Sequence, residues 1–488
     1  MKILMLSPEV APFSKAGGLA DMVASLSKEM SSQGNEVKIF TPLYSSVKRD
    51  KDFSVALPTM SVHMGLGIEE FCRIWQRPFG NAQILFAEFD RYFHREGIYN
   101  YGDISYDDNP QRFAFMCKAA LDYCSHTDWI PDVIHCHDWT SAYAPMYLNT
   151  THKYAPIGKA ATVFTIHNLQ HQGVFGKDAL NYAGLPMLEV FKPDNCEHFG
   201  ALNLLKGALY NSTKITTVSP TYAKEIQTAE YGCGLDGVVR FKAADLVGII
   251  NGIDGDEWNP AKDKFIPKNY SVKSLAGKKE AKKILQEKLG LKVDASIPVF
   301  GIISRLFDQK GLDLLCAIAQ PLLQNMDIQF AMLGSGDKGL ENAFRQLSKN
   351  HPKSFGAVIG YDNALSHLIE AGSDFFVMPS RFEPCGLNQI YSMAYGTLPI
   401  VRATGGLADT VQNYNEKDVS GTGFMFSEAS TSALYNTIGW ACSTWYDRKS
   451  DYLKLQKNAM NKDFSWSKSA DAYINVYKWA VDERKKAF

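Results

Sequence analysis

The sequence predicts an α/β protein with two doubly wound, Rossmann-like domains that face a central cleft. Three observations support this. Short apolar runs recur in both halves of the chain, a stretch with helical spacing follows most of them, and glycines stand in several of the loops that connect a strand to the next helix. Such alternation implies parallel sheets with right-handed crossovers. The 488 residues also exceed what one ordinary core organises.

In the N-terminal half, Lys2–Leu6 is predicted to be a buried strand, followed by a loop that reaches Gly18. Apolar residues then recur at helical spacing up to Gly34. Further strands of the same sheet are predicted at 37–41, 133–135 and 163–166. The residues between 50 and 110 show no clear pattern, so antiparallel strands and long loops both remain open there.

The C-terminal half shows the alternation more clearly and predicts a second doubly wound domain. The predicted strands are 299–303, 328–333, 357–359, 375–378 and 398–401, and helices are expected from about 311, 338 and 387.

We expect three parts. Residues 1–246 form the N-terminal Rossmann-like domain, 247–461 the C-terminal Rossmann-like domain, and 462–488 a terminal helix with one apolar face that must pack on a domain. Trp258–Lys283, rich in Lys, Asp and Pro, is predicted to be a linker and surface loop. Loops at the carboxyl ends of both sets of strands would line the cleft.

Composition excludes several classes of protein. Lys plus Arg number 51 and Asp plus Glu 52, so the formal charge of −1 gives no general field for nucleic acid. No apolar run is long enough for a membrane helix, and the apolar N-terminus is too short for a signal peptide. Nine scattered cysteines without a CxxC pair indicate reduced thiols and a cytoplasmic protein.

Two segments of the N-terminal half could bind a ligand. Lys15-Ala16-Gly17-Gly18 opens a helix, where backbone amides attract phosphate, although an ordinary glycine-containing loop would look the same. His135-Cys136-His137-Asp138-Trp139 ends a strand. A metal site would need a third ligand nearby, so Asp138 beside Trp139 better suits sugar binding, with a structural cap as the alternative. His167 ends the next strand and could face the cleft or be structural.

The C-terminal half carries the cations. Arg305 and Lys310 lie between a strand and a helix N-terminus, where positive charges are unfavourable unless an anion such as a diphosphate sits between them. The alternative is a solvated surface pair. A formal GxGxxG at 334–339 is too weak a signal for a dinucleotide site.

The most informative segment is Met378–Leu387. Glu383 follows a buried strand, and the amides of Cys385, Gly386 and Leu387 would point outward at the start of a helix. Thr404-Gly405-Gly406 repeats a glycine turn after the next strand. Glu383 could otherwise be a first-turn acid that only favours the helix dipole.

Together these segments resemble the bacterial glycogen and starch synthases, retaining glucosyltransferases of the GT-B architecture. The resemblance covers nearly the whole chain, through SPEVAPFSKAGGLADM, DNPQRFAFM, HCHDW, FTIHNLQHQG, VSPTYAKEI, INGID, SRLFDQKGLDL, SRFEPCGLNQIYSMAYGTLPIVRATGGLADTV and DFSW.

The resemblance implies a role for each matching residue. Glu383 would lie beside the transferring glucose, Arg305 and Lys310 on the diphosphate, His167 near the glucose 6-hydroxyl, and Asp138 would orient the glucose or the glucan end. Donor binding would also involve Lys15, Gly17, Gly18, Asn251, Tyr361, Cys385, Gly386, Leu387, Thr404, Gly405 and Gly406. Asp21 and Trp139 would lie on the acceptor side. The resemblance also implies that residues 1–246 form the acceptor-side domain, that 247–461 bind the nucleotide sugar, and that the helix 462–488 packs back on the N-terminal domain. Many retaining relatives carry a second glutamate where this chain has Tyr391.

The activity so implied is transfer of glucose from ADP-glucose to the nonreducing 4-hydroxyl of an α-1,4-glucan, with retention and without a metal or other cofactor. The alternatives are a UDP-glucose-preferring synthase, a nucleotide-sugar epimerase on the same fold, and a noncatalytic glucan-binding protein. The expected partners are a nucleotide sugar and an α-glucan, with neither nucleic acid nor membrane. The oligomeric state is left open.

Overall fold

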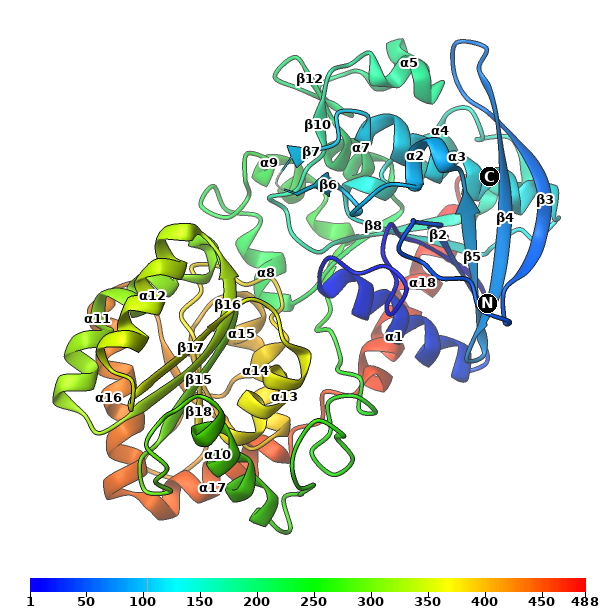
Figure 1. Ribbon diagram of the computed structural model, residues 1–488. Helices are drawn as coiled ribbons and strands as arrows, with labels where there is room; N and C mark the ends of the chain where they lie inside the picture. Colours follow the sequence, from blue (N-terminus) through cyan, green and yellow to red (C-terminus); the bar gives the residue numbers. More distant parts are fainter. Residues whose placement is uncertain (103) are drawn as a thin grey trace. The chain divides into compact units, whose positions relative to one another are not determined.

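The computed structural model describes residues 1–102 and 104–488 (Figure 1). The chain divides into two compact units. Unit 1 comprises Met1–Gly252 together with Trp466–Phe488, and unit 2 comprises Ile253–Ser465. Each unit is built on its own sheet.

Unit 1 contains a nine-stranded sheet in the order β14-β13-β9-β8-β1-β2-β5-β4-β3. The strands from β14 to β5 are parallel, whereas β4 runs antiparallel to both β5 and β3. Their bounds are β1 Lys2–Leu6, β2 Glu36–Pro42, β3 Ser54–His63, β4 Glu69–Phe79, β5 Ala82–Glu88, β8 Val133–His137, β9 Ala161–Ile166, β13 Lys214–Thr217 and β14 Leu246–Gly248. The region without a clear sequence pattern therefore adds one parallel strand and an antiparallel hairpin.

The helices of unit 1 include long ones that cover the sheet and short ones in the connections. They are α1 Gly18–Ser32, α2 Asp90–Phe93, α3 Asn109–His126, α4 Tyr143–Asn149, α5 Ala179–Ala183, α6 Met187–Val190, α7 Leu204–Asn211, α8 Pro220–Glu225, α9 Asp236–Phe241 and α18 Trp466–Lys485. Short strands form two small sheets, β6 Asn100–Tyr101 with β7 Ile104–Ser105, and β10 Val174–Phe175 with β12 Ala201–Asn203 and β11 Glu197–His198.

The C-terminal helix α18 belongs to unit 1, as predicted. One face of α18 enters the core that α1 and the central strands form, through Trp466, Ala470, Tyr473, Val476, Tyr477 and Ala480. Polar contacts fix both ends of the helix. Ser469 donates to the carbonyl of Ile250 at 2.6 Å, and Glu483 forms an ion pair with Lys214.

Unit 2 contains a six-stranded sheet in the order β17-β16-β15-β18-β19-β20, parallel throughout. The strands are β15 Val299–Leu306, β16 Gln329–Gly336, β17 Phe355–Ile359, β18 Phe375–Met378, β19 Leu398–Arg402 and β20 Phe424–Phe426. The helices are α10 Ala276–Lys288, α11 Leu312–Asn325, α12 Lys338–Asn350, α13 Asn363–Gly372, α14 Asn388–Ala394, α15 Gly405–Thr410, α16 Thr431–Asp447 and α17 Lys449–Met460.

Helices cover both faces of this sheet, with α11, α12 and α16 on one face and α10 and α13 on the other (Figure 1). A separate apolar core fills each interface. Burial on both faces explains why these strands have continuous apolar sequences. The predicted α/β class with two parallel sheets is thus confirmed.

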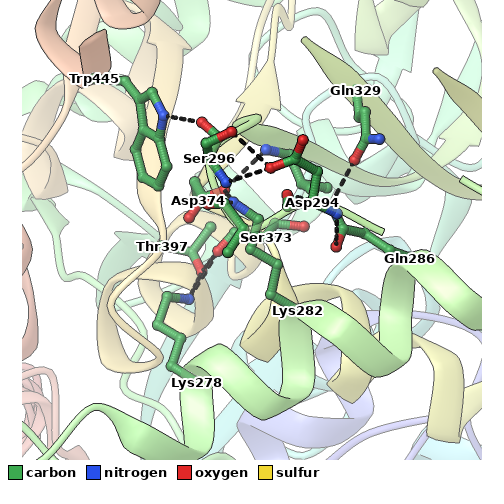
Figure 2. Close-up of polar contacts among 12 residues, drawn as sticks. Lys278, Lys282, Gln286, Asp294, Ser296, Gln329, Ser373, Asp374, Thr397 and Trp445 are labelled. Carbon is green, nitrogen blue, oxygen red and sulfur yellow. Dashed lines mark hydrogen bonds and ion pairs between the residues drawn. The ribbon is translucent and has the colours of Figure 1, made fainter. Parts of the chain in front are cut away.

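The prediction of a surface loop over Trp258–Lys283 is wrong for its last part, because α10 begins at Ala276. Lys278 and Lys282 on α10 are buried, and both point toward the ends of neighbouring strands and loops (Figure 2). The Lys278 ammonium donates to the carbonyls of Ala371 and Ser373 and to Thr397 Oγ1, at 2.7–2.9 Å. Lys282 forms an ion pair with Asp374 at 2.7 Å. Internal partners therefore allow a lysine-rich segment to fold as a helix with one buried face.

No helix in the described ranges is both long and apolar enough to cross a membrane.

Candidate functional site

The predicted site residues of each unit follow the carboxyl ends of its parallel strands. In unit 1 the loop after β1 holds Lys15, Gly17 and Gly18, β8 and β9 are followed by Asp138, Trp139 and His167, and Asn251 follows β14. In unit 2 the residues are Arg305 and Lys310 near the end of β15, Tyr361 after β17, Glu383–Leu387 after β18 and Thr404–Gly406 after β19. This is the edge at which open α/β sheets bind ligands.

The lysine-glycine loop of unit 1 is held by an internal carboxylate. Glu9 Oε2 accepts hydrogen bonds from the amides of Ala16 and Gly17 at 2.6 and 3.0 Å, and Glu9 Oε1 accepts one from the Tyr99 hydroxyl at 2.5 Å. Burial raises the pKa of Glu9 despite these bonds. The Lys15 ammonium forms an ion pair with Asp21 at 2.8 Å on the first turn of α1. These contacts hold both the backbone of the loop and its lysine side chain within unit 1.

Asp138 has an unusual backbone for a residue with a side chain. Its φ of 54° and ψ of −177° lie in a region that glycine normally occupies. The Asp138 carboxylate accepts a hydrogen bond from the backbone amide of His167 at 2.8 Å, which links the ends of β8 and β9. Burial raises the pKa of Asp138 to about 7. Strain and a perturbed carboxyl group at a strand end are typical of functional sites.

Three histidines next to Asp138 form a largely buried group. His137 Nδ1 lies 3.1 Å from His167 Nε2, while His135 contacts Thr165 Oγ1 at 2.6 Å and the Tyr477 hydroxyl of α18 at 2.7 Å. Burial lowers the pKa of all three imidazoles, that of His167 to about 3. The imidazoles are therefore neutral at pH 7. Within the described residues no three His, Cys, Asp or Glu side chains are placed to hold a metal.

Trp139 stands next to Asp138 among other rings. Its ring contacts Phe113 edge to face at 5.2 Å between centroids and lies 5.5 Å from Phe175. Gly173 passes so close that an added Cβ would lie 2.6 Å from the indole. The indole is thus fixed in position.

In unit 2 the central feature is an ion pair. Lys310 Nζ lies 2.7 Å from Glu383 Oε2, and the Ser380 hydroxyl donates to the same oxygen at 3.1 Å. The Glu383 side chain is 8% exposed and that of Lys310 is 19% exposed. The two residues come from the loops after β15 and β18, so the pair joins neighbouring strands at the sheet edge.

The glycine turn after β19 packs closely against the loop that carries Glu383. The amide of Gly406 donates to the carbonyl of Glu383 at 3.1 Å. A Cβ at Gly405 would lie 1.9 Å from that carbonyl, and one at Gly406 would lie 2.0 Å from the carbonyl of Cys385. Only glycine permits this close approach, which explains the paired glycines.

Arg305 and Tyr361 differ from Lys310 in being exposed. The Arg305 guanidinium lies 5.6 Å from the centroid of the Phe307 ring and forms no ion pair with another described residue. Tyr361 is 81% exposed, and its hydroxyl donates to Asn363 at 3.0 Å. Of the two predicted cations, the structure brings only Lys310 to Glu383.

Tyr391, at the place of the second glutamate of other retaining enzymes, is part of an aromatic stack. The Trp258 ring lies between Tyr391 and His367, with centroid distances of 3.9 and 4.0 Å and nearly parallel planes. His367 is held in turn by Asp263 at 2.8 Å. A carboxylate at position 391 would lose this stacking, which gives a structural reason for the tyrosine.

Comparisons with known proteins agree over the full length. Residues 2–241 match the family described as "Starch synthase catalytic domain", and residues 284–461 match "Glycosyl transferases group 1". The chain is 45% identical to "Glycogen synthase 1" of Geobacter sulfurreducens over 99% of this chain and 97% of that protein. It is 42% identical to "Glycogen synthase" of Treponema denticola over 99% of both chains. The chain belongs to the glycogen and starch synthase family.

A solved structure of this family extends the likeness to the fold. The catalytic domain of starch synthase IV from Arabidopsis thaliana, described as bound to ADP and acarbose, aligns over 99% of both chains with a TM-score of 0.91 and 32% identity. The sucrose-phosphate synthase of Thermosynechococcus elongatus, at 18% identity and a TM-score of 0.60, shares the fold. The chain is therefore a glycosyltransferase with the GT-B fold.

Sequence reasoning about this synthase missed several residues that the structure brings to the site. Glu9 lies in the segment SPEVAPFSKAGGLADM, but nothing in that segment assigns it a role, and its partner Tyr99 stands 90 positions away in none of the matching segments. Ser380 lies in the Met378–Leu387 segment, where the sequence gives it no role. The sequence suggests His137 only as a metal ligand, whereas the structure places it against His167. These contacts depend on which strands are neighbours in the sheet, and a single sequence does not reveal that order.

Proposed function

We propose that this synthase transfers glucose from ADP-glucose to the nonreducing 4-hydroxyl of an α-1,4-glucan, with retention of the anomeric configuration. The observation that carries the proposal is the likeness, over nearly all of both chains, to glycogen synthases at 42–45% identity. The starch synthase IV structure described with ADP and acarbose supports an adenine nucleotide and an oligosaccharide as ligands.

In this proposal Lys310 stabilises the leaving diphosphate. Its ammonium has three N–H donors, and one of them is used by Glu383. The others can bind phosphate oxygens, whose negative charge grows as the glycosidic bond breaks. Arg305 is exposed and free of ion pairs with described residues, so it can turn to the same anion. Charge stabilisation of this kind is typically worth about 10²–10³ in rate per donor.

Glu383, Asp138 and His167 are assigned to the sugars. Glu383 would lie beside the transferring glucose, with the amides of Cys385, Gly386 and Leu387 near its hydroxyls or the outer phosphate. Asp138 would orient the glucose or the glucan end, and neutral His167 would contact the 6-hydroxyl. Lys15, Gly17, Gly18, Asn251, Tyr361 and Thr404–Gly406 are assigned to the donor, and Asp21 and Trp139 to the acceptor side.

The retaining step fits a route in which the leaving phosphate oxygen takes the proton of the acceptor hydroxyl on the same face. Position 391 carries a stacked tyrosine, so it supplies no second carboxylate for a double displacement. Electrons pass from the acceptor oxygen to the anomeric carbon while the old bond returns its pair to the phosphate.

The test is an assay of purified protein with ADP-glucose and glycogen. We expect ADP release above a control without glycogen, and lengthened chains that an α-1,4-specific hydrolase degrades. If ADP release stays at the control level, the proposal is wrong. Competition between ADP-glucose and UDP-glucose distinguishes the two donors, and a changed sugar nucleotide formed without acceptor would favour an epimerase.

We also propose that the protein acts in the cytoplasm. All nine cysteines have free thiols, and eight of them are at least partly buried. Reduced thiols of this kind are usual in a reducing compartment.

A further inference from the structure

Glu9 is a buried carboxylate in unit 1 to which the proposed function assigns no role. It is 3% exposed and follows β1 by three residues. Its two oxygens receive three short hydrogen bonds, two from the amides of Ala16 and Gly17 and one from Tyr99. These are the amides of the loop that opens α1, so the protein supplies its own anion at a helix N-terminus.

We propose that Glu9 is a positioning residue for donor binding: it fixes the lysine-glycine loop, so that Lys15 and the first free amides of α1 are presented to the donor phosphates. This inference rests on the proposed function, because it assumes that the loop binds the donor.

The backbone amides of the loop would bind two different anions, the Glu9 carboxylate and the donor phosphate. Ala16 and Gly17 are occupied by Glu9 at 2.6 and 3.0 Å. Helix α1 begins at Gly18, and the first amides of a helix have no partner inside it. The amides of Gly18 and Leu19 are therefore the ones left for a phosphate. Glu9 thus determines which amides of the loop remain available to a phosphate.

Tyr99 fixes the other side of the carboxylate. Its hydroxyl donates to Glu9 Oε1 at 2.5 Å, and its ring lies 6.0 Å from that of Phe113 and 6.5 Å from that of Trp139. Asn109 on α3 donates to the Tyr99 carbonyl at 3.0 Å. Glu9 is therefore tied to the rigid aromatic group beside Asp138 as well as to the loop.

A glutamine is the conservative substitution here. In Glu9→Gln the amide oxygen can still accept from Ala16 and Gly17, while the amide nitrogen can donate to Tyr99, whose hydroxyl also accepts. Glu9→Ala removes all three bonds. Tyr99→Phe removes only the bond to Oε1 and leaves the bonds to the loop amides.

The experiment compares donor KM, kcat and the Kd for ADP in wild type, Glu9→Ala, Glu9→Gln and Tyr99→Phe. Glu36→Ala serves as the control. Glu36 also accepts a hydrogen bond, from Trp129, but it is the first residue of β2 and so lies at the sheet edge opposite to the lysine-glycine loop. For Glu9→Ala we expect KM for ADP-glucose and Kd for ADP to rise about tenfold or more, with a smaller fall in kcat and an unchanged KM for glycogen. Glu9→Gln should stay within about threefold of wild type, and Tyr99→Phe should lie between the two.

Hydrogen exchange gives a readout that does not depend on activity. The amides of Ala16 and Gly17 should exchange slowly in wild type and faster in Glu9→Ala. Unchanged donor KM and ADP Kd in folded Glu9→Ala would overturn the proposal. So would Glu9→Gln as defective as Glu9→Ala, because the effect would then come from charge and not from hydrogen bonds. If Glu9→Ala does not fold, Tyr99→Phe decides, and wild-type values for it overturn the proposal. An inactive wild type would instead refute the proposed function.

Discussion

The ion pair between Lys310 and Glu383 offers a test that separates folding from chemistry. Lys310→Met keeps most of the side-chain volume but leaves the Glu383 carboxylate, 8% exposed, with the Ser380 hydroxyl as its only side-chain partner among the residues that the structure describes. Breaking a fully buried pair costs about 3–5 kcal/mol, whereas exposed pairs are worth at most about 1 kcal/mol. Because the Lys310 side chain is 19% exposed, we expect a loss of about 2–3 kcal/mol.

Calorimetry measures this loss. For a unit on the order of 200 residues, 1 kcal/mol shifts Tm by about 2–4 °C, so the transition of unit 2 should fall by about 5–10 °C. The double variant Lys310→Met with Glu383→Gln should recover most of this loss, because no buried charge is left unpaired. Turnover should stay at least 10²-fold low in both variants, about the size of one lost charge contact.

Wild-type melting of Lys310→Met would contradict this prediction, since the ion pair would then contribute nothing to stability in solution. A double variant less stable than Lys310→Met would contradict it as well. A turnover that recovers with Tm in the double variant would show that Lys310 acts only on folding.

Three further predictions concern single residues. Arg305→Ala should leave Tm unchanged, because Arg305 is exposed, and lower kcat by about 10²–10³. Gly405→Ala should lower both Tm and kcat, because its Cβ would meet the Glu383 carbonyl at 1.9 Å, whereas Gly255→Ala, with open space around it, should change neither. Asp138→Asn should melt higher than wild type by a margin that grows from about pH 4 to pH 7, because the folded protein holds the Asp138 proton up to a pKa of about 7 while the unfolded chain releases it near 4.

Each of these has a contrary result. A lower Tm for Arg305→Ala would reveal a structural role, and an unchanged kcat would remove its charge role. Wild-type behaviour of Gly405→Ala would mean that the two loops do not touch. A constant Tm difference for Asp138→Asn across this pH range would mean that the carboxyl group titrates alike in both states. The expected slope is at most about 1.4 kcal/mol per pH unit.

The parallel strands of this protein were predictable because both of their faces are buried. Lys2–Leu6 and Phe375–Met378 are strands over the predicted ranges. Continuous apolar runs of this length fit a strand that is buried on both faces. By contrast, β3 and β4 bury only some of their residues, and β4 carries four charged side chains, so the alternation of apolar and polar residues is weak in their sequences.

Helix α10 shows why a polar segment can be wrongly predicted to be a surface loop. Its sequence, with five lysines, looks like a solvated loop. In the structure Gln286 donates to Gln329 at 2.8 Å and Lys278 is surrounded by acceptors (Figure 2). The partners come from segments about 40 to 120 positions away. The cost of burying these groups is offset by contacts that only the folded chain provides.

The same reason limits prediction of the site. The sequence correctly predicted that Asp138, His167, Lys310 and Glu383 follow the carboxyl ends of strands. This is the edge at which parallel sheets bind ligands. Glu383 pairs with Lys310 and not with Arg305. Which cation it meets depends on the directions in which side chains point in the loops after two neighbouring strands. Sequence motifs propose candidate site residues, whereas the fold decides which of them contact one another.

Helix α18 has a consequence for how the protein is made. The unit that the ribosome begins first is completed last, because its sheet face stays uncovered until residues 466–485 emerge. All of residues 253–465 are synthesised in between, which takes roughly ten to forty seconds at typical elongation rates. During that interval the apolar surface that receives Tyr473 and Tyr477 is open to chaperones and to other nascent chains. A chain that ends before the final helix would carry a complete second unit joined to an incomplete first one.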